Sequence, residues 1–338
     1  MISKKRSSGF ANRKHNEPER GDTGTNGPRW QPGEDQAVGP SSPTVIYIHS
    51  AAEASMARRS VLFSPGDQPE LMRKAPRTGA DTVVFDLEDA VVPEAKAAAR
   101  EAVAGVLGDP AFDPDCEVCV RLNPDPETAA LDAEAIAATD PRLDSIAVPK
   151  AGSAGDVHAI YDLIAARGYD CPVIALCESA AGILDAEDIA AADPVDAIAF
   201  GAEDLSADIG ATRTEDGVEV SHARQHVVLA AGAAGVDAID TLVTDIGAED
   251  HLKSEAGFAR QLGYDGKMAI HPTQVDIINE AFTPPPEDVE WAKRVLAAAD
   301  AAEREGRGVV RVDDEMVDAP LIAQAGTILE RHEAAERD

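Results

Sequence analysis

The stretch that decides the fold is Thr82-Val83-Val84-Phe85-Asp86-Leu87-Glu88-Asp89. It begins with four β-branched or aromatic residues, and carboxylates follow directly. A short apolar run of this kind predicts a buried strand. Carboxylates at its end must face solvent, a ligand or a basic partner, because a buried and unpaired charge is costly.

The same pattern recurs along the chain from Arg59 onward. Apolar runs that predict eight strands are Ser60 to Phe63, Thr82 to Phe85, Glu117 to Leu122, Ser145 to Val148, Pro172 to Leu176, Ala197 to Phe200, Val236 to Ile239 and Lys267 to Ile270. Ala-rich amphipathic segments between them predict helices, for example Pro93 to Leu107, Asp156 to Arg167, Val218 to Ala234 and Ala248 to Gln261. Eight such units over roughly 220 residues predict a TIM (β/α)₈ barrel with a C-terminal helical extension. A doubly wound open sheet is the alternative, since periodicity does not distinguish an open sheet from a closed one.

Polar or charged residues follow nearly every predicted strand. They are Ser64-Pro65-Gly66, Asp86-Leu87-Glu88-Asp89, Arg121-Leu122-Asn123-Pro124, Pro149-Lys150, Glu178-Ser179, Glu203-Asp204, Asp240-Thr241 and His271-Pro272. The carboxyl ends of parallel barrel strands share one rim, so these side chains should converge on a single mouth. The sequence therefore predicts one site there.

The charge of the chain limits its partners. It has 62 acidic and 30 basic residues, a formal net charge of −32, and only 4% aromatic residues. This charge repels nucleic acid and anionic membranes, and no apolar run approaches the ~18 to 20 residues of a membrane-spanning helix. We expect a soluble cytoplasmic protein. The composition also favours a halophile, whose molar salt screens self-repulsion, over an ordinary acidic enzyme.

The composition changes near Met56. We expect residues 1–55, which are rich in Gly, Pro, Asn, Ser and Thr, to be disordered or a mis-annotated extension, with translation starting at Met56. A genuine flexible tail is the competing interpretation. Residues 56–283 are expected to form the catalytic barrel, and residues 284–338 a helical extension that contributes to a neighbouring active site.

Several enzyme classes lose support because their motifs are missing. The strand-to-helix junctions carry no Gly-rich dinucleotide fingerprint, phosphate loop or GxSxG elbow. Hydride transfer, nucleotide hydrolysis and serine hydrolysis are therefore disfavoured. Carboxylates with one arginine suit a hard cation such as Mg²⁺ and an anionic substrate.

Six ordered motifs resemble those of the HpcH/HpaI aldolase and citrate lyase β-subunit-like superfamily, which includes malyl-CoA, methylmalyl-CoA and citramalyl-CoA lyases. The resemblance extends from Arg59 to the C-terminus. The motifs are Arg59-Ser60-Val61-Leu62-Phe63-Ser64-Pro65-Gly66, Asp86-Leu87-Glu88-Asp89-Ala90-Val91, Val120-Arg121-Leu122-Asn123-Pro124, Glu178-Ser179-Ala180-Ala181-Gly182, Gly201-Ala202-Glu203-Asp204-Leu205 and Ile270-His271-Pro272 with Gln274.

The resemblance implies that Glu178 and Asp204 ligate Mg²⁺, with Mn²⁺ as the alternative cation. Their separation of 26 positions (204 − 178) spans one βα unit and places them on adjacent strand ends. It also implies that Glu88 and Asp89 orient metal-bound water. The structural alternatives are a neighbour of a helix N-cap for Glu178, a solvated loop charge for Asp204, and charges favouring a helix N-terminus for Glu88 and Asp89.

The remaining implied roles concern the substrate. Arg121 would hold its carboxylate or carbonyl oxygen, or else form a structural ion pair. Arg59 and Lys74 are candidates for the CoA phosphates, with surface ion pairs as the alternative. For His271, a loop-anchoring role is as well supported as catalysis. Asp318, in a C-terminal segment that reaches a neighbouring subunit in acyl-CoA members, would be the acid/base at the thioester α-carbon, unless it only caps the following helix.

The reaction implied is Mg²⁺-dependent cleavage or formation of a C–C bond in a β-hydroxyacyl-CoA, with CoA as part of the substrate. The products of cleavage would be acetyl-CoA or propionyl-CoA plus glyoxylate or pyruvate. The alternatives are a malyl-CoA thioesterase, a citrate lyase β subunit acting on a carrier-bound citryl thioester, and a non-catalytic assembly subunit. A donated Asp318 requires a homo-oligomer, for which a trimer or hexamer is expected.

Overall fold

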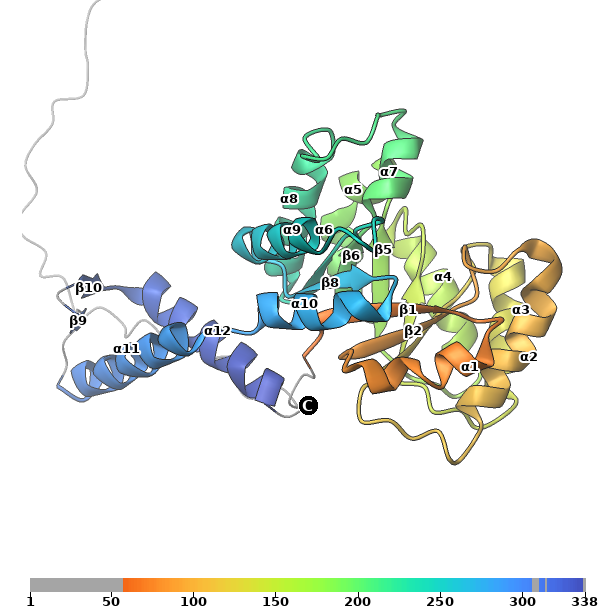
Figure 1. Ribbon diagram of the computed structural model, residues 1–338, viewed down its shortest axis with the longest axis horizontal. Coiled ribbons are helices and arrows are strands. Elements are labelled where there is room, and N and C mark those ends of the chain that lie inside the picture. The colour runs from red at the N-terminus through yellow and green to blue at the C-terminus, as the bar shows by residue number, and fades with distance from the viewer. Residues whose placement is uncertain (1–56, 306–309, 314, 337–338) are drawn as a thin grey trace, which may run out of the picture. The chain divides into compact units, whose positions relative to one another are not determined.

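The computed structural model describes residues 57–305, 310–313 and 315–336. Eight parallel strands form a closed barrel in chain order, with β1 paired to β8 (Figure 1). The strands are β1 (Ser60–Pro65), β2 (Thr82–Asp86), β3 (Glu117–Arg121), β4 (Ser145–Val148), β5 (Val173–Cys177), β6 (Val195–Phe200), β7 (Asp237–Asp240) and β8 (Gly266–Ala269). Closure confirms the barrel and excludes the open sheet. The predictions for residues 1–55 lie outside the described residues.

Helices follow the strands and cover the outside of the barrel (Figure 1). They are α1 (Pro69–Met72), α2 (Lys96–Leu107), α3 (Pro126–Ala137), α4 (Ala154–Ala165), α5 (Ala180–Leu184), α6 (Ala186–Ala190), α7 (Ala202–Asp208), α8 (Ser221–Ala234), α9 (Glu249–Leu262) and α10 (Pro272–Phe282). Two 3₁₀ turns, η1 (Ala75–Thr78) and η2 (Pro93–Ala95), precede β2 and α2.

Alternation along each strand separates two apolar cores. One cluster fills the barrel interior and includes Val84, Cys119 and Leu176. Their neighbours, such as Phe85, belong to a larger cluster between the strands and the helices. Residues two apart share one face of a strand, so the polar residue two positions after an inward apolar residue also points inward. This alternation places polar side chains at the strand ends in the mouth of the barrel.

The predicted strand boundaries differ from the observed ones by one or two residues, except at Ser145–Val148, which matches, and the helix predicted from Val218 begins three residues later, at Ser221. Strands β1 and β2 continue into polar residues because the parallel ladder continues there, with Pro65 opposite Asp86 and Asp86 opposite Arg121. The helix predicted from Pro93 begins as the turn η2, and α2 starts at Lys96.

The C-terminal extension is built from α11 (Pro286–Arg304), a two-stranded antiparallel hairpin of β9 (Val310–Val312) and β10 (Glu315–Val317), and α12 (Ala319–Glu336). Ala292, Val295, Val317 and Ala325 belong to its small apolar core. Arg331 on α12 also forms an ion pair with Asp265, at 2.6 Å. Within the described ranges, no helix combines the length and hydropathy needed to cross a membrane.

Candidate active site

A cavity of about 440 Å³ opens at the carboxyl ends of the barrel strands. It brings together polar residues that are far apart in the sequence with an apolar wall. The lining residues are Phe63, Ser64, Pro65, Asp86, Asp89, Ala90, Arg121, Leu176, Glu178, Gly201, Ala202, Glu203, Asp204, Thr241, Leu242, Met268 and Ile270. Arg121 is the only cation among these lining residues of the described chain.

Arg121, at the end of β3, is fixed by the neighbouring strand. Its Nε donates to Asp86 Oδ1 at 2.8 Å, and an Nη donates to Asp86 Oδ2 at 2.6 Å. The guanidinium carbon lies 5.0 Å from the centre of the Phe63 ring, within the range of a cation–π contact. Asp86 also accepts hydrogen bonds from the backbone N–H groups of Glu88 and Ala90. Asp86 thereby occupies the Nε–Nη edge of the planar guanidinium and fixes Arg121 at the wall of the cavity.

Glu88 lies between two cations although it is almost completely buried. Its side chain is 5% exposed, its Oε1 accepts from Lys150 Nζ, and its Oε2 is 3.1 Å from an Arg121 Nη. Oε2 has no hydrogen-bond partner with adequate geometry. Burial raises the pKa of Glu88, and Arg121 and Lys150 oppose that effect. The second predicted member of this acidic pair, Asp89, is exposed and lies 3.7 Å from Lys150 Nζ.

Glu178 and Asp204 come from adjacent barrel positions. Glu178 directly follows β5 and is buried, whereas Asp204 is in the first turn of α7, after β6. Burial, with help from the carboxylates of Asp204 and Glu88, raises the pKa of Glu178 to about 8. The backbone N–H of Lys150 donates to Glu178 Oε1 at 2.8 Å and opposes the rise. A buried carboxylate beside a second one is the environment that a bound cation would stabilise.

Gly201 leaves the room that the Glu178 carboxylate needs to act as a metal ligand. A Cβ at Gly201 would lie 2.7 Å from Glu178 Oε2 and 2.5 Å from its Cβ, so only glycine leaves the carboxylate in place. Within the described residues, no group of three or more His, Cys, Asp or Glu side chains is arranged to hold a metal ion. Two carboxylates match Mg²⁺, which keeps several water or substrate ligands.

Lysines support the acidic loop after β2, and sequence reasoning gave them no role. Lys96 Nζ donates to the carbonyls of Leu87 and Glu88 at 2.5 and 2.6 Å, and to Asn123 Oδ1 at 2.9 Å. Lys150 binds Glu88 itself. Phe63 and Asp86 were also given no role. The available signal for Lys150 and Asp86 was their place at the ends of β4 and β2.

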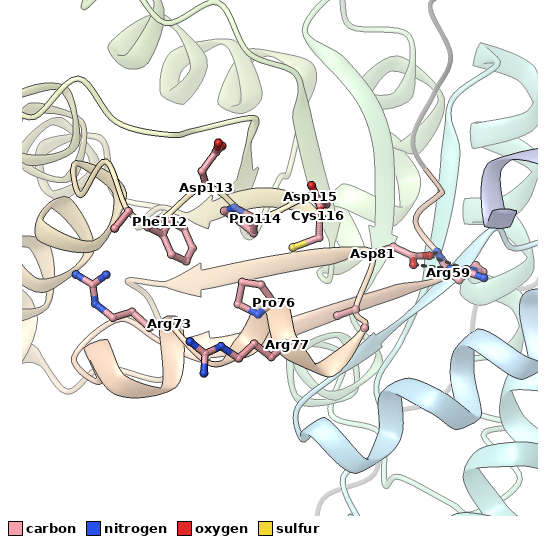
Figure 2. A pocket seen from close by; sticks show the side chains of 13 residues that line it. Arg59, Arg73, Pro76, Arg77, Asp81, Phe112, Asp113, Pro114, Asp115 and Cys116 are labelled. Carbon is pink, nitrogen blue, oxygen red and sulfur yellow. Dashed lines mark hydrogen bonds and ion pairs between the residues drawn. The ribbon is translucent and has the colours of Figure 1, made fainter. Parts of the chain in front are cut away.

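The structure does not bring Arg59 to the mouth. Arg59 precedes β1, so it lies at the amino-terminal end of the barrel, where it donates to both carboxylate oxygens of Asp81 at 2.8 Å and to Thr283 Oγ1 at 3.0 Å. It lines a separate cavity of about 470 Å³, in which it points toward Asp81 (Figure 2). This ion pair with Asp81 is the alternative that the sequence left open for Arg59. Lys74, between α1 and η1, is exposed.

His271 and Asp318 both lie at helix starts. His271 is the N-cap of α10, where its side chain accepts from the Thr273 N–H and forms a capping box with Gln274. This geometry favours its anchoring role. Asp318 is exposed beyond β10, and its Oδ1 accepts from the Leu321 N–H at 3.4 Å, near the start of α12. It does not line the mouth cavity of its own chain.

Comparisons with known proteins find similar sequences over most of the chain. The family model described as HpcH/HpaI aldolase/citrate lyase matches residues 59–272. The chain is 38% identical to citrate lyase subunit beta of Haemophilus influenzae over 83% of this chain and 99% of that protein. It is 36% identical to a (3S)-malyl-CoA thioesterase of Cereibacter sphaeroides, over 82% of this chain and 95% of that protein.

A solved structure of a similar protein contains bound ligands. The crystal structure of CitE from Mycobacterium tuberculosis in complex with magnesium, acetoacetate and coenzyme A has 37% sequence identity and a TM-score of 0.67. The match covers 82% of this chain and 98% of that one. The prediction of magnesium and CoA is thus confirmed at the level of this relative.

Proposed function

Because the chain belongs to the HpcH/HpaI aldolase/citrate lyase family, we propose that it is a Mg²⁺-dependent carbon–carbon lyase that acts on a β-hydroxyacyl-CoA. The substrates proposed are malyl-CoA, β-methylmalyl-CoA and citramalyl-CoA. Family membership confirms the resemblance seen in the six motifs, and it agrees with the predicted lyase class. The observation that carries the proposal is the oriented guanidinium of Arg121 in one cavity with Glu178 and Asp204.

Five residues at the carboxyl ends of the strands have a defined part in this proposal. Glu178 and Asp204 would hold Mg²⁺, which supplies positive charge to the substrate oxygens when bound. Arg121 binds the substrate carboxylate through its planar donors. Glu88 and Asp89 orient water at the site. The water that Glu88 and Asp89 orient would accept the β-hydroxyl proton. The hydroxyl oxygen then becomes the carbonyl oxygen of the oxo acid, the Cα–Cβ bond breaks, and the bonding electrons form the enolate of the thioester.

The enolate then needs a proton, and Asp318 of a second copy is the proposed donor. Asp318 is exposed and does not line the cavity of its own chain, which is compatible with donation to a neighbour. The product would be acetyl-CoA or propionyl-CoA, released with glyoxylate or pyruvate. This arrangement requires a homo-oligomer, proposed to be a trimer or hexamer, and assigns the catalytic barrel to residues 56–283 and the donated extension to 284–338.

Two other reactions would use the same cavity. The malyl-CoA thioesterase relative supports hydrolysis of the thioester, and the citrate lyase relatives support cleavage of a carrier-bound citryl thioester. We favour free CoA thioesters because Lys74 is exposed and available for CoA phosphates, and because the Asp318 segment is present.

Product identification distinguishes these reactions. We expect that incubation with Mg²⁺ and malyl-CoA, β-methylmalyl-CoA or citramalyl-CoA releases a short acyl-CoA and an oxo acid, identified by mass spectrometry. Free CoA with intact malate would instead establish the thioesterase, and cleavage of a carrier-bound citryl thioester alone would establish the citrate lyase subunit.

Replacing Asp318 tests its catalytic role separately from its position at the start of α12. Asn caps a helix about as well as Asp, so Asp318→Asn should preserve α12. We expect turnover to fall by at least about 100-fold with substrate binding retained, because Asn cannot supply the proton. Normal turnover would leave Asp318 with the capping role.

Mixing two variants tests donation between subunits. Asp318→Asn and Asp204→Ala each disable a different part of the site, so mixed oligomers should contain some sites with both parts intact. We expect activity to reappear when the two inactive variants are dissociated and reassembled together. If Asp318 acted within its own chain, no mixture would recover activity.

The composition supports two further proposals. We assign the protein to the cytoplasm, and the formal net charge of −32 supports a cytoplasm of high salt concentration.

A further inference from the structure

Lys150, two residues after the end of β4, has an unusual backbone conformation. Its φ is +52°, in the left-handed region that costs a non-glycine residue about 1 kcal/mol or more. In this conformation its backbone N–H donates to Glu178 Oε1 at 2.8 Å, while its Nζ donates to Glu88 Oε1. One residue therefore contacts a proposed metal ligand and the neighbouring buried carboxylate.

Glu88 is the third carboxylate near the metal position. It is close enough to Glu178 for its charge to act on that group, yet both of its oxygens face cations: Oε1 faces Lys150, and Oε2 faces Arg121 at 3.1 Å. Oε2 is buried and has no hydrogen-bond partner. If the ammonium were absent, Glu88 would keep only Arg121, whose guanidinium already donates two hydrogen bonds to Asp86.

We propose that Lys150 is a positioning residue that holds Glu88 against itself and Arg121, so that Glu88 does not become a third carboxylate ligand of the metal. Mg²⁺ prefers six oxygen ligands, and each added carboxylate removes a position that water or a chelating substrate would take. This inference rests on the proposed binding of Mg²⁺ by Glu178 and Asp204.

Two variants remove the ammonium in different ways. Lys150→Met keeps a stem of similar length, and Lys150→Gly suits the positive φ and keeps the backbone N–H that Glu178 accepts. In isothermal titration with MgCl₂ and no substrate, we expect both to bind Mg²⁺ about threefold to tenfold more tightly than the unchanged protein. The reasons are the freed carboxylate and the loss of a nearby positive charge. We expect kcat to fall about 10-fold to 100-fold.

The direction of the change in Mg²⁺ affinity shows whether Lys150 positions Glu88 or only stabilises the loop. If Lys150 only stabilised the loop, its loss would disorder Glu178 and weaken Mg²⁺ binding. Lys150→Arg keeps the charge, so it should return the affinity toward that of the unchanged protein. Lys253→Met is the matched control, because Lys253 is 67% exposed on α9 and its carboxylate partner, Glu280, is 75% exposed.

The possible outcomes also separate this inference from the proposed function. If the unchanged protein does not bind Mg²⁺, the proposed function itself is overturned. If the unchanged protein binds Mg²⁺ but both Lys150 variants bind it equally or more weakly, the role of Lys150 is overturned and the metal site stands. Tighter binding in both variants, with a lower kcat, supports the inference.

Discussion

Glu178→Gln is expected to abolish Mg²⁺ binding, lower turnover by at least about 1,000-fold, and stabilise the metal-free protein. Gln keeps the shape of the side chain and can still accept the 2.8 Å hydrogen bond from the Lys150 N–H. It lacks the charge that makes Glu178 costly to bury beside Asp204, a cost shown by its pKa of about 8. We expect a gain of about 1 to 3 kcal/mol in the free energy of unfolding of the metal-free protein.

Titration calorimetry with MgCl₂ and thermal melting with and without Mg²⁺ measure both effects. Glu203→Gln is the matched control, since Glu203 lines the same cavity but is exposed and paired with Arg213 at 2.9 Å. The control should keep Mg²⁺ binding. A Glu178→Gln variant that binds Mg²⁺ as the unchanged protein does would contradict the metal assignment, and one that is also less stable would show that Glu178 is structural.

The barrel and the position of its mouth could be predicted because both follow from simple periodicities. Apolar runs such as Thr82–Asp86 recur at βα spacing, and parallel strands place their carboxyl ends on one rim. The alternation of side chains along each strand then determines which polar residues point into the barrel. Val84 lies inside the barrel, so Asp86 continues on the same face, and Arg121 follows Cys119 in the same way.

The finer contacts of the site could not be predicted because they depend on geometry between strands. The left-handed conformation of Lys150, which joins Glu178 to Glu88, has no signature in a Pro-Lys dipeptide. The position of Arg59 was hard to predict for a different reason. Its motif implied CoA binding, but a residue that precedes its strand lies at the opposite end from the mouth, and Asp81 binds it there.

Arg58→Met is expected to cause a large loss of stability in the barrel. Arg58 is 8% exposed at the amino-terminal end, where it binds Glu117 of β3 at 2.7 Å, Asp196 of β6 at 2.8 Å and Asp237 of β7 at 3.2 Å. Burial opposes its charge, yet these carboxylates raise its pKa above the ordinary value. Removing it leaves Glu117, which is 3% exposed, without a cation. We expect a loss of about 3 to 5 kcal/mol, or a melting temperature lower by roughly 10 °C.

The matched control is Arg294→Met, because Arg294 and its partner Asp313 are 50% and 59% exposed. Loss of such a surface pair should change stability by less than about 1 kcal/mol. Thermal melting of both variants at pH 8 makes the comparison. If Arg58→Met melted within about 2 °C of the unchanged protein, the carboxylate cluster would not depend on this cation.

The pH dependence of the stability loss in Arg58→Met identifies the cause of that loss. Burial raises the pKa of Asp237 to about 7, Asp265 adds to the rise, and Arg58 opposes it. A carboxyl group whose pKa is higher in the folded than in the unfolded state binds its proton more tightly when folded, so stability falls as pH rises from about 4 to 7. Without Arg58 the pKa rises further and this fall steepens. The loss of unfolding free energy in Arg58→Met should therefore be smaller at pH 5 than at pH 8, because protonation removes the uncompensated charge. If the loss came from packing alone, it would be equal at both pH values.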